Sequence, residues 1–101
     1  MTEYYFDKFY RLSNKWKFET GMLSDMEQAA QHPAHKEIVA MGKIVLPLIF
    51  DNMIVYQDAH WYYALEAITG HEIRPPKDKQ GDIRWLDEQW IQWGKDNGYI
   101  R

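Results

Sequence analysis

Four histidines are the side chains of this sequence best suited to metal or acid–base chemistry. His32 and His35 lie three residues apart, on either side of Pro33. Two imidazoles at that spacing can meet one metal ion, and Asp58, His60 or Glu37 could complete its ligand set. Pro33, however, turns the chain between them, which separates the two rings. The alternative interpretation is that His32 ends a helix and His35 is a solvated residue in the next first turn.

His60 stands between Asp58 and Trp61 in the sequence. At the second or third position of a helix, its imidazole would lie at the positive end of the helix dipole, which favours the neutral ring. A neutral ring beside Asp58 could transfer protons. The alternative is that His60 hydrogen-bonds the backbone of the preceding turn and fixes how two helices meet. Because no Ser-His-Asp ordering and no phosphate-binding glycine loop is present, we predict no catalytic residue, no metal and no cofactor.

The tryptophans of the last segment point in too many directions for one buried stripe. At about 100° per residue, Trp90 and Trp93 share a helix face with Ile83 and Leu86, so these four are predicted to be core. Trp85 lies on another side and is predicted to be exposed.

The tyrosines raise the same question, because Tyr62 and Tyr63 cannot both point inward beside Trp61. Exposed aromatic side chains rimmed by polar groups are typical of recognition surfaces. The alternative is that a small domain packs most of them in a thick aromatic core. The residues predicted to bind a partner are Trp85, Tyr62, Tyr63, Tyr4, Tyr10 and His60.

Length, charge and cysteine usage narrow the classes of protein. The chain has 101 residues, of which 46% are apolar and 16% aromatic, so residues 1–101 are expected to form one folded domain. There is no cysteine, which excludes disulfides and thiolate chemistry and is compatible with a reducing cytoplasm. The first twelve residues lack the apolar core of a secretory signal, and the apolar run at 41–55 is too short for a membrane span. We therefore expect a cytoplasmic protein.

Nucleic acid is disfavoured as the main ligand. The net charge is −3, and the twelve basic residues are scattered, whereas phosphate-backbone binding needs clustered cations. The longest local group, Arg74 with Lys77 and Lys79, faces Glu72 and Asp78. Nucleic-acid binding through this loop with aromatic stacking is retained as an alternative.

Helical periodicity begins at residues 3–19, where Phe6, Phe9, Leu12 and Trp16 recur at spacings of three and four. The stretch "SDME" at 24–27 has the spacing of a capping box and predicts a short helical segment that ends near His32. Pro33 suits the first position of the next helix, because its missing N–H has no partner there.

Pro47 decides between helix and strand for the apolar run "KIVLPLIF" at 43–50. A proline within a run argues against a central strand. If the chain turns at 41–43 and a helix begins near Ile44, Pro47 falls in or just after its first turn and removes no hydrogen bond. The predicted buried stripe is Leu46, Ile49, Phe50 and Met53.

The remaining segments complete an all-α prediction without a sheet. Asp58 is the predicted N-cap of a helix that ends at Gly70, residues 71–81 form a flexible loop, and the last helix spans 82–94. Residues 95–101 form a tail whose Tyr99 and Ile100 pack back on the domain. The predicted architecture is a five-helix bundle or HEAT-like α-solenoid fragment.

Two resemblances accompany this pattern. Residues of about 33–70, "EIVAMGKIVLPLIFDNM" and then "AHWYYALEAITG", resemble a degenerate HEAT repeat, with Met41-Gly42 as the turn and Leu46, Pro47 and Ile49 opening the second helix. The resemblance implies stacked helix pairs, with the flanking helices as caps because no second copy is visible.

The whole chain resembles a group of short, uncharacterised bacterial proteins through "HPAHKEIVAMG", "LPLI", "HWYYALEAITG" and "NGY". From the exposed aromatics we predict a small protein-interaction module, of the antitoxin, inhibitor or adaptor type, that binds another protein or itself. The open alternatives are a small enzyme or metal-binding protein centred on His60, and a nucleic-acid-binding protein.

Overall fold

The computed structural model describes residues 2–23, 25–56 and 60–100, and within them it is built of helices without a strand. The all-α prediction is therefore confirmed. Six α-helices are present in this part of the chain instead of the predicted five. The short helical segment predicted before His32 is α2, which has four residues. The elements are α1 (Thr2–Thr20), α2 (Met26–Ala29), α3 (Pro33–Ala40), η1 (Gly42–Val45), α4 (Leu46–Tyr56), α5 (Tyr62–Thr69), η2 (Lys77–Lys79) and α6 (Ile83–Asp96), where η denotes a 3₁₀ helix.

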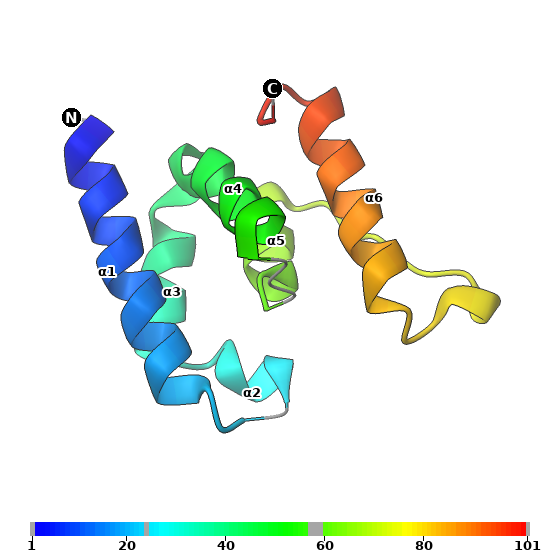
Figure 1. Ribbon diagram of the computed structural model, residues 1–101, viewed down its shortest axis with the longest axis horizontal. Coiled ribbons are helices and arrows are strands. Elements are labelled where there is room, and N and C mark those ends of the chain that lie inside the picture. Colours follow the sequence, from blue (N-terminus) through cyan, green and yellow to red (C-terminus); the bar gives the residue numbers. More distant parts are fainter. Residues whose placement is uncertain (1, 24, 57–59, 101) are drawn as a thin grey trace.

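The helices surround one apolar core. Helix α1 lies alongside α3, α4 and α5 occupy the middle, and α6 stands on the side away from α1 (Figure 1). Helix α1 packs chiefly against α3, α3 also packs against α5, and α6 rests on α4. The buried indoles of Trp16, Trp61 and Trp90 are the largest side chains of this core.

Pro33 is the first residue of α3, as predicted. Its missing N–H costs no hydrogen bond at that position. The preceding residue, His32, is the N-cap, and its ring accepts a hydrogen bond from the Ala34 N–H. An imidazole thus takes the place that serine or aspartate usually occupies at a helix start.

Pro47 lies in the first turn of α4, which confirms the helical interpretation of "KIVLPLIF". Gly42 has a φ of 77° and turns the chain into η1, so that α4 begins at Leu46. A first-turn amide has no partner within its helix, and proline removes nothing there. The predicted stripe is fully buried, at Leu46, Ile49, Phe50 and Met53.

Other helix boundaries follow the predicted chemistry in part. The N-cap of α2 is Asp25, whose carboxylate accepts from the Glu27 N–H at 2.9 Å, while Ser24 of the predicted capping box lies outside the described residues. Asp58, the predicted N-cap of α5, also lies outside them. Gly70 ends α5 at a φ of 71°, as predicted. The loop at 71–81 contains the short helix η2.

The end of α6 folds the following residues back onto the helix. The Tyr99 N–H donates to the Gly94 carbonyl at 2.8 Å, and the Gly98 N–H donates to the Lys95 carbonyl at 3.2 Å. Gly98 has a φ of 81°, which completes a Schellman motif. Tyr99 and Ile100 are partly buried against the core, so the predicted packing of this tail is confirmed.

One predicted core residue is wrong. Ile83 is 44% exposed, although Trp90 is fully buried and Leu86 and Trp93 are partly buried as predicted. Ile83 belongs to the first turn of α6 and faces an open groove that is also lined by Met53 and Ile54 of α4. Periodicity gave the direction of this side chain, but no described element covers it.

No single described helix is long and apolar enough to cross a membrane. One pair, Pro33–Ala40 with Gly42–Tyr56, meets the length and composition criteria together, but it is bent by 106°.

Candidate partner-binding surface

Tyr4 and Tyr63 are exposed, as the prediction of partner-binding residues requires. Tyr4 projects from α1 beside Asp7, Lys8 and Arg11 and lines a shallow pocket with them. Tyr63 lies in the first turn of α5. Partial burial raises the pKa of the Tyr63 phenol, and the acidic Glu27, Asp25 and Glu66 raise it further. The two tyrosines stand on different elements and share no contact that would make them one surface.

Tyr62 is buried, at 4% exposure, so its predicted place on a contact surface is wrong. Its hydroxyl donates to the Ile83 carbonyl at 3.3 Å, at the start of α6. The phenol ring can therefore sit in the core because its polar end reaches a backbone acceptor. Tyr62 links α5 to α6, and its truncation should affect folding before it affects binding.

Trp85 is partly buried instead of exposed. It lies in the first turn of α6, where its backbone N–H donates to the Oδ1 of the N-cap residue Asp82 at 3.0 Å. Gln89, its neighbour one turn along the helix, is also partly buried. Because its indole shares this covered side of the helix, Trp85 offers less surface than the helical wheel predicts.

His60 is exposed, and it lies two residues before α5, not at the second or third helical position that the sequence suggested. Because α5 starts at Tyr62, His60 lies outside the helix, and the argument that placed its ring at the positive end of the helix dipole does not apply. The His60 ring centre is 6.3 Å from that of Trp16, in an edge-on contact. His60 consequently belongs to the surroundings of the buried Trp16.

Two surface aromatic side chains of α1 lie against each other and begin a stripe along this helix. Phe6 and Tyr10 are four residues apart, and their ring centres are 4.7 Å apart. Phe6 is exposed and Tyr10 is partly buried, because Tyr10 also meets the core residue Phe9 edge-on at 5.2 Å. Among the residues predicted to bind a partner, Tyr10 is thus the one that anchors this stripe to the core.

Lys17 continues the stripe and connects it to α4. It lies seven residues after Tyr10, which is two helical turns. Its ammonium lies 5.4 Å from the ring centre of Tyr56, at the end of α4, and 5.6 Å from that of Trp61. It also donates to the Oδ1 of Asn52, a buried residue of α4. Cation–π contacts and a buried acceptor therefore hold Lys17 in place.

Tyr56 extends this surface on α4 and is 65% exposed. Its neighbours Ile54 and Val55 are exposed as well, so the last turn of α4 is apolar and open. We define the α1–α4 stripe as Phe6, Tyr10, Lys17 and Tyr56. Phe6, Lys17 and Tyr56 were not predicted from the sequence. Two signals could have indicated Phe6 and Tyr56: the four-residue step from Phe6 to Tyr10, and the apolar run that continues beyond the buried positions of α4.

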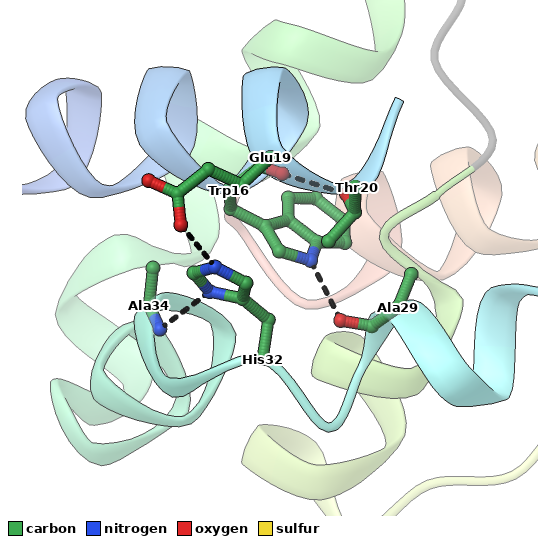
Figure 2. Close-up of polar contacts among 6 residues, drawn as sticks. All are labelled: Trp16, Glu19, Thr20, Ala29, His32 and Ala34. Carbon is green, nitrogen blue, oxygen red and sulfur yellow. Dashed lines mark hydrogen bonds and ion pairs between the residues drawn. The ribbon is translucent and has the colours of Figure 1, made fainter. Parts of the chain in front are cut away.

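A second constellation fixes the corner between α1 and α3 (Figure 2). The Nδ1 of His32 accepts from the Ala34 N–H at 3.0 Å, and its Nε2 lies 2.8 Å from a Glu19 carboxylate oxygen. If Nδ1 accepts, Nε2 carries the proton and donates to Glu19. Both nitrogens of this neutral ring are committed. His32 therefore holds α3 against α1 and has no nitrogen left for a substrate.

His35 is buried at 3% exposure, which overturns the interpretation of a solvated first-turn residue. Its ring centre is 5.1 Å from that of Trp16, whose Nε1 donates to the Ala29 carbonyl at 2.8 Å (Figure 2 shows the latter bond). Burial lowers the pKa of His35 below its ordinary value, and the neighbouring His32 lowers it further.

The structure does not gather the residues named for a metal site. Within residues 2–23, 25–56 and 60–100, no group of three or more His, Cys, Asp or Glu side chains is placed to hold a metal ion. Asp58 lies outside those residues. His71, the remaining histidine, stacks on Trp93 at 5.6 Å.

The basic loop before α6 is partly neutralised. The Arg74 guanidinium lies 3.1 Å from a Glu72 carboxylate oxygen, and both side chains are exposed. Lys77 and Lys79 lie on η2 together with Asp78. Cations that alternate with acids in this way form a weaker phosphate-binding surface than a uniform basic patch.

Comparison of the chain with protein-family models, curated proteins and solved structures finds no match.

Proposed function

We propose that this chain is a non-enzymatic protein-interaction module that docks another protein through the α1–α4 stripe. The supporting observation is a pair of contacts along one side of α1: the ring pair of Phe6 and Tyr10, and, two turns further on, the Lys17 ammonium that lies over Tyr56 and is held by Asn52. Aromatic side chains at the centre of an interface, with polar groups at the rim, contribute most of its binding energy. Antitoxin, inhibitor and adaptor roles all use such a surface, and the cysteine-free composition fits a cytoplasmic setting.

The proposed partner is a protein with an apolar or aromatic contact patch that carries an acceptor for Lys17. Lys17 already lies over two rings, so a carboxylate from the partner would approach an ordered cation and lose little side-chain entropy. A second copy of this chain is the other protein partner to test.

Site-specific photo-crosslinking in the native host tests the proposal. A benzoylphenylalanine at Tyr56 is expected to give one crosslinked protein, and the same group at the exposed Gln92 of α6 is expected to give none. The affinity of that purified protein is then measured for the double variant Phe6→Ser/Tyr56→Ser and for Phe18→Ser. Phe18 is the matched control because it is an 89% exposed aromatic on the same helix, outside the stripe.

The double variant should weaken binding at least tenfold, which corresponds to about 1.4 kcal/mol, and Phe18→Ser should leave it unchanged. Equal losses for both variants would refute the stripe as the contact surface. Sedimentation of the purified chain alone decides whether the crosslinked protein is a second copy.

A further inference from the structure

The α1–α3 corner holds a histidine whose surroundings suit only its neutral form. His35 is almost fully buried against Trp16, and its Nε2 has no hydrogen-bond partner among the described residues. No ion pair among the described residues includes His35. A proton added to this ring would therefore place a positive charge in the core without a counter-ion.

The charged groups of the neighbouring elements do not provide that counter-ion. Helix α1 contributes Lys15 and Glu19, which line a cleft of about 420 Å³ together with His32 and Glu37 of α3, and Glu19 is already engaged by His32. His60 approaches Trp16 from the segment before α5. The described elements packed against α3 carry further titratable groups. They are Tyr4, Tyr5, Asp7, Lys8, Tyr10, Arg11 and Lys17 on α1, Tyr62, Tyr63 and Glu66 on α5, and Lys43 on η1.

His32 supports the same corner through contacts at both ring nitrogens. Its Nδ1 accepts from the Ala34 N–H, and its Nε2 lies 2.8 Å from a Glu19 carboxylate oxygen. The Nε2 of His35, by contrast, has no partner among the described residues.

We propose that the α1–α3 corner is an acid-sensitive clasp, in which protonation of His35 releases α1 from α3 while α4, α5 and α6 stay packed. Helix α1 is the element that should move, because α3 is the element against which it packs most closely. Its ring contacts with Trp61 and the Lys17 contact with Asn52 must break in the same step. Trp16, its largest buried side chain, is the residue that contacts His35 directly.

The sign of the effect follows from burial. The pKa of His35 is lowered in the folded state, so the open state binds a proton first as the pH falls below the ordinary value of 6.5. The equilibrium constant for opening then rises by up to about tenfold per pH unit for this one proton, until the pH falls below the pKa of the folded state.

For the proposed function, the clasp would be a regulator. Phe6, Tyr10 and Lys17 lie on α1 and Tyr56 lies on α4, so release of α1 would divide the α1–α4 stripe at mildly acidic pH. This step rests on the docking proposal, whereas the clasp itself does not.

Distances between spin labels test the clasp without any partner. The chain has no cysteine, so cysteines can be introduced in pairs for labelling. One pair, at the exposed Phe18 and Lys36, spans α1 and α3, and a control pair, at the exposed Asp51 and Gln92, spans α4 and α6. Between pH 7.5 and 5.5, the first pair should gain a longer-distance population and the second should not change.

His35→Phe removes the titrating group and keeps an aromatic ring beside Trp16, and it should abolish the longer population at pH 5.5. His35→Leu serves if the phenylalanine variant does not fold, and His71→Gln is the matched control that should retain the response. An unchanged first pair, equal broadening of both pairs, or a persistent response in His35→Phe would each overturn the clasp.

Binding of the crosslinked partner at the two pH values then tests the regulation separately. Loss of affinity at pH 5.5 that His35→Phe restores supports the regulatory role. If the spin labels show opening but affinity is unchanged, the clasp stands and its regulatory role is refuted. If Phe6→Ser/Tyr56→Ser binds normally at pH 7.5, the docking proposal alone is refuted.

Discussion

Trp16 and Trp93 each organise an aromatic cluster, and the two clusters differ in what holds them. Trp16 is fully buried, donates to the Ala29 carbonyl and meets Trp61 at 4.9 Å. Trp93 is only partly buried and lies between ring contacts, with Tyr99 stacked at 5.8 Å and 11° and His71 at 5.6 Å and 21°. The first cluster joins α1 to the start of α5 deep in the core. The second gathers at the end of α6, where the ring centre of Phe50 from α4 lies 6.2 Å from that of Trp93.

Local sequence can specify the contact between Trp93 and Tyr99, whereas the contacts of Trp16 come from remote segments. Tyr99 reaches Trp93 because Gly98 closes a Schellman motif. The two hydrogen bonds of this motif, from Tyr99 to Gly94 and from Gly98 to Lys95, join residues that are close together in the sequence. The contacts of Trp16 join α1 to residues of α2, α3 and the start of α5, which are remote in sequence. Such a cluster depends on the whole fold and should contribute more to its cooperativity.

Truncation of the two tryptophans tests most directly whether the clusters differ in their contribution to stability. Trp16→Ala should lower the free energy of unfolding by about 3–5 kcal/mol, because it removes a buried indole and leaves the Ala29 carbonyl without its donor. Trp93→Ala is the matched variant and should lose less, since its indole is half-buried. Urea titration of both proteins measures the difference. Equal losses would mean that the two clusters contribute alike.

The pH dependence of stability should distinguish the clusters next. As the pH falls below 6.5, the unfolded state protonates His35 before the folded state does, so the free energy of unfolding decreases. The steepest slope for this one proton is about 1.4 kcal/mol per pH unit. Denaturant titrations between pH 7.5 and 5.5 should show it in the native sequence and in His71→Gln, but not in His35→Phe. A slope retained by His35→Phe would assign the proton to another group.

Gly94 tests the packing beside the Trp93 cluster. A Cβ at this position would lie 2.8 Å from the Ile100 Cδ1 and 3.1 Å from the Phe50 Cε2. Overpacking costs about 1–3 kcal/mol, and alanine returns about 1 kcal/mol of helix propensity, so Gly94→Ala should destabilise by about 1 kcal/mol net. Thermal unfolding of Gly94→Ala and of Gly94→Ala/Ile100→Val checks this. The second change should recover part of the loss, and a stabilised single variant would contradict the close contact.

The smallest effect is expected outside both clusters. Phe18→Ser should change the free energy of unfolding by no more than about 0.5 kcal/mol, because the ring is almost fully exposed on α1. Chemical denaturation of this variant also validates it as the control for partner binding. A larger loss would show that Phe18 has a contact in solution.

Much of the fold was predictable because it rests on local chemistry. Pro33 and Pro47 mark helix starts, and Gly42 and Gly70 supply left-handed turns, at the positions that the sequence indicated. The HEAT resemblance stays a prediction. The predicted count of five helices was wrong, since six are described, although the short segment that Asp25 caps was itself predicted.

The candidate site was less predictable, since exposure depends on what lies opposite a side chain. Tyr62 was predicted to be exposed, yet the start of α6 covers it and its hydroxyl finds a backbone acceptor. Ile83 was predicted to be core, yet it is 44% exposed beside an open groove. His35 was predicted to be solvated, yet α1 lies across it through Trp16. Helical periodicity contains none of these tertiary neighbours.

The close pair of Trp16 and Trp61 has an optical consequence. Two indoles 4.9 Å apart and inclined by 48° couple their electronic transitions, which produces an exciton couplet in circular dichroism. This couplet overlaps the helical bands, so helix content derived from the spectrum of this protein should deviate from its true value. The same couplet is a built-in reporter, since it depends on the mutual orientation of two indoles from α1 and the start of α5.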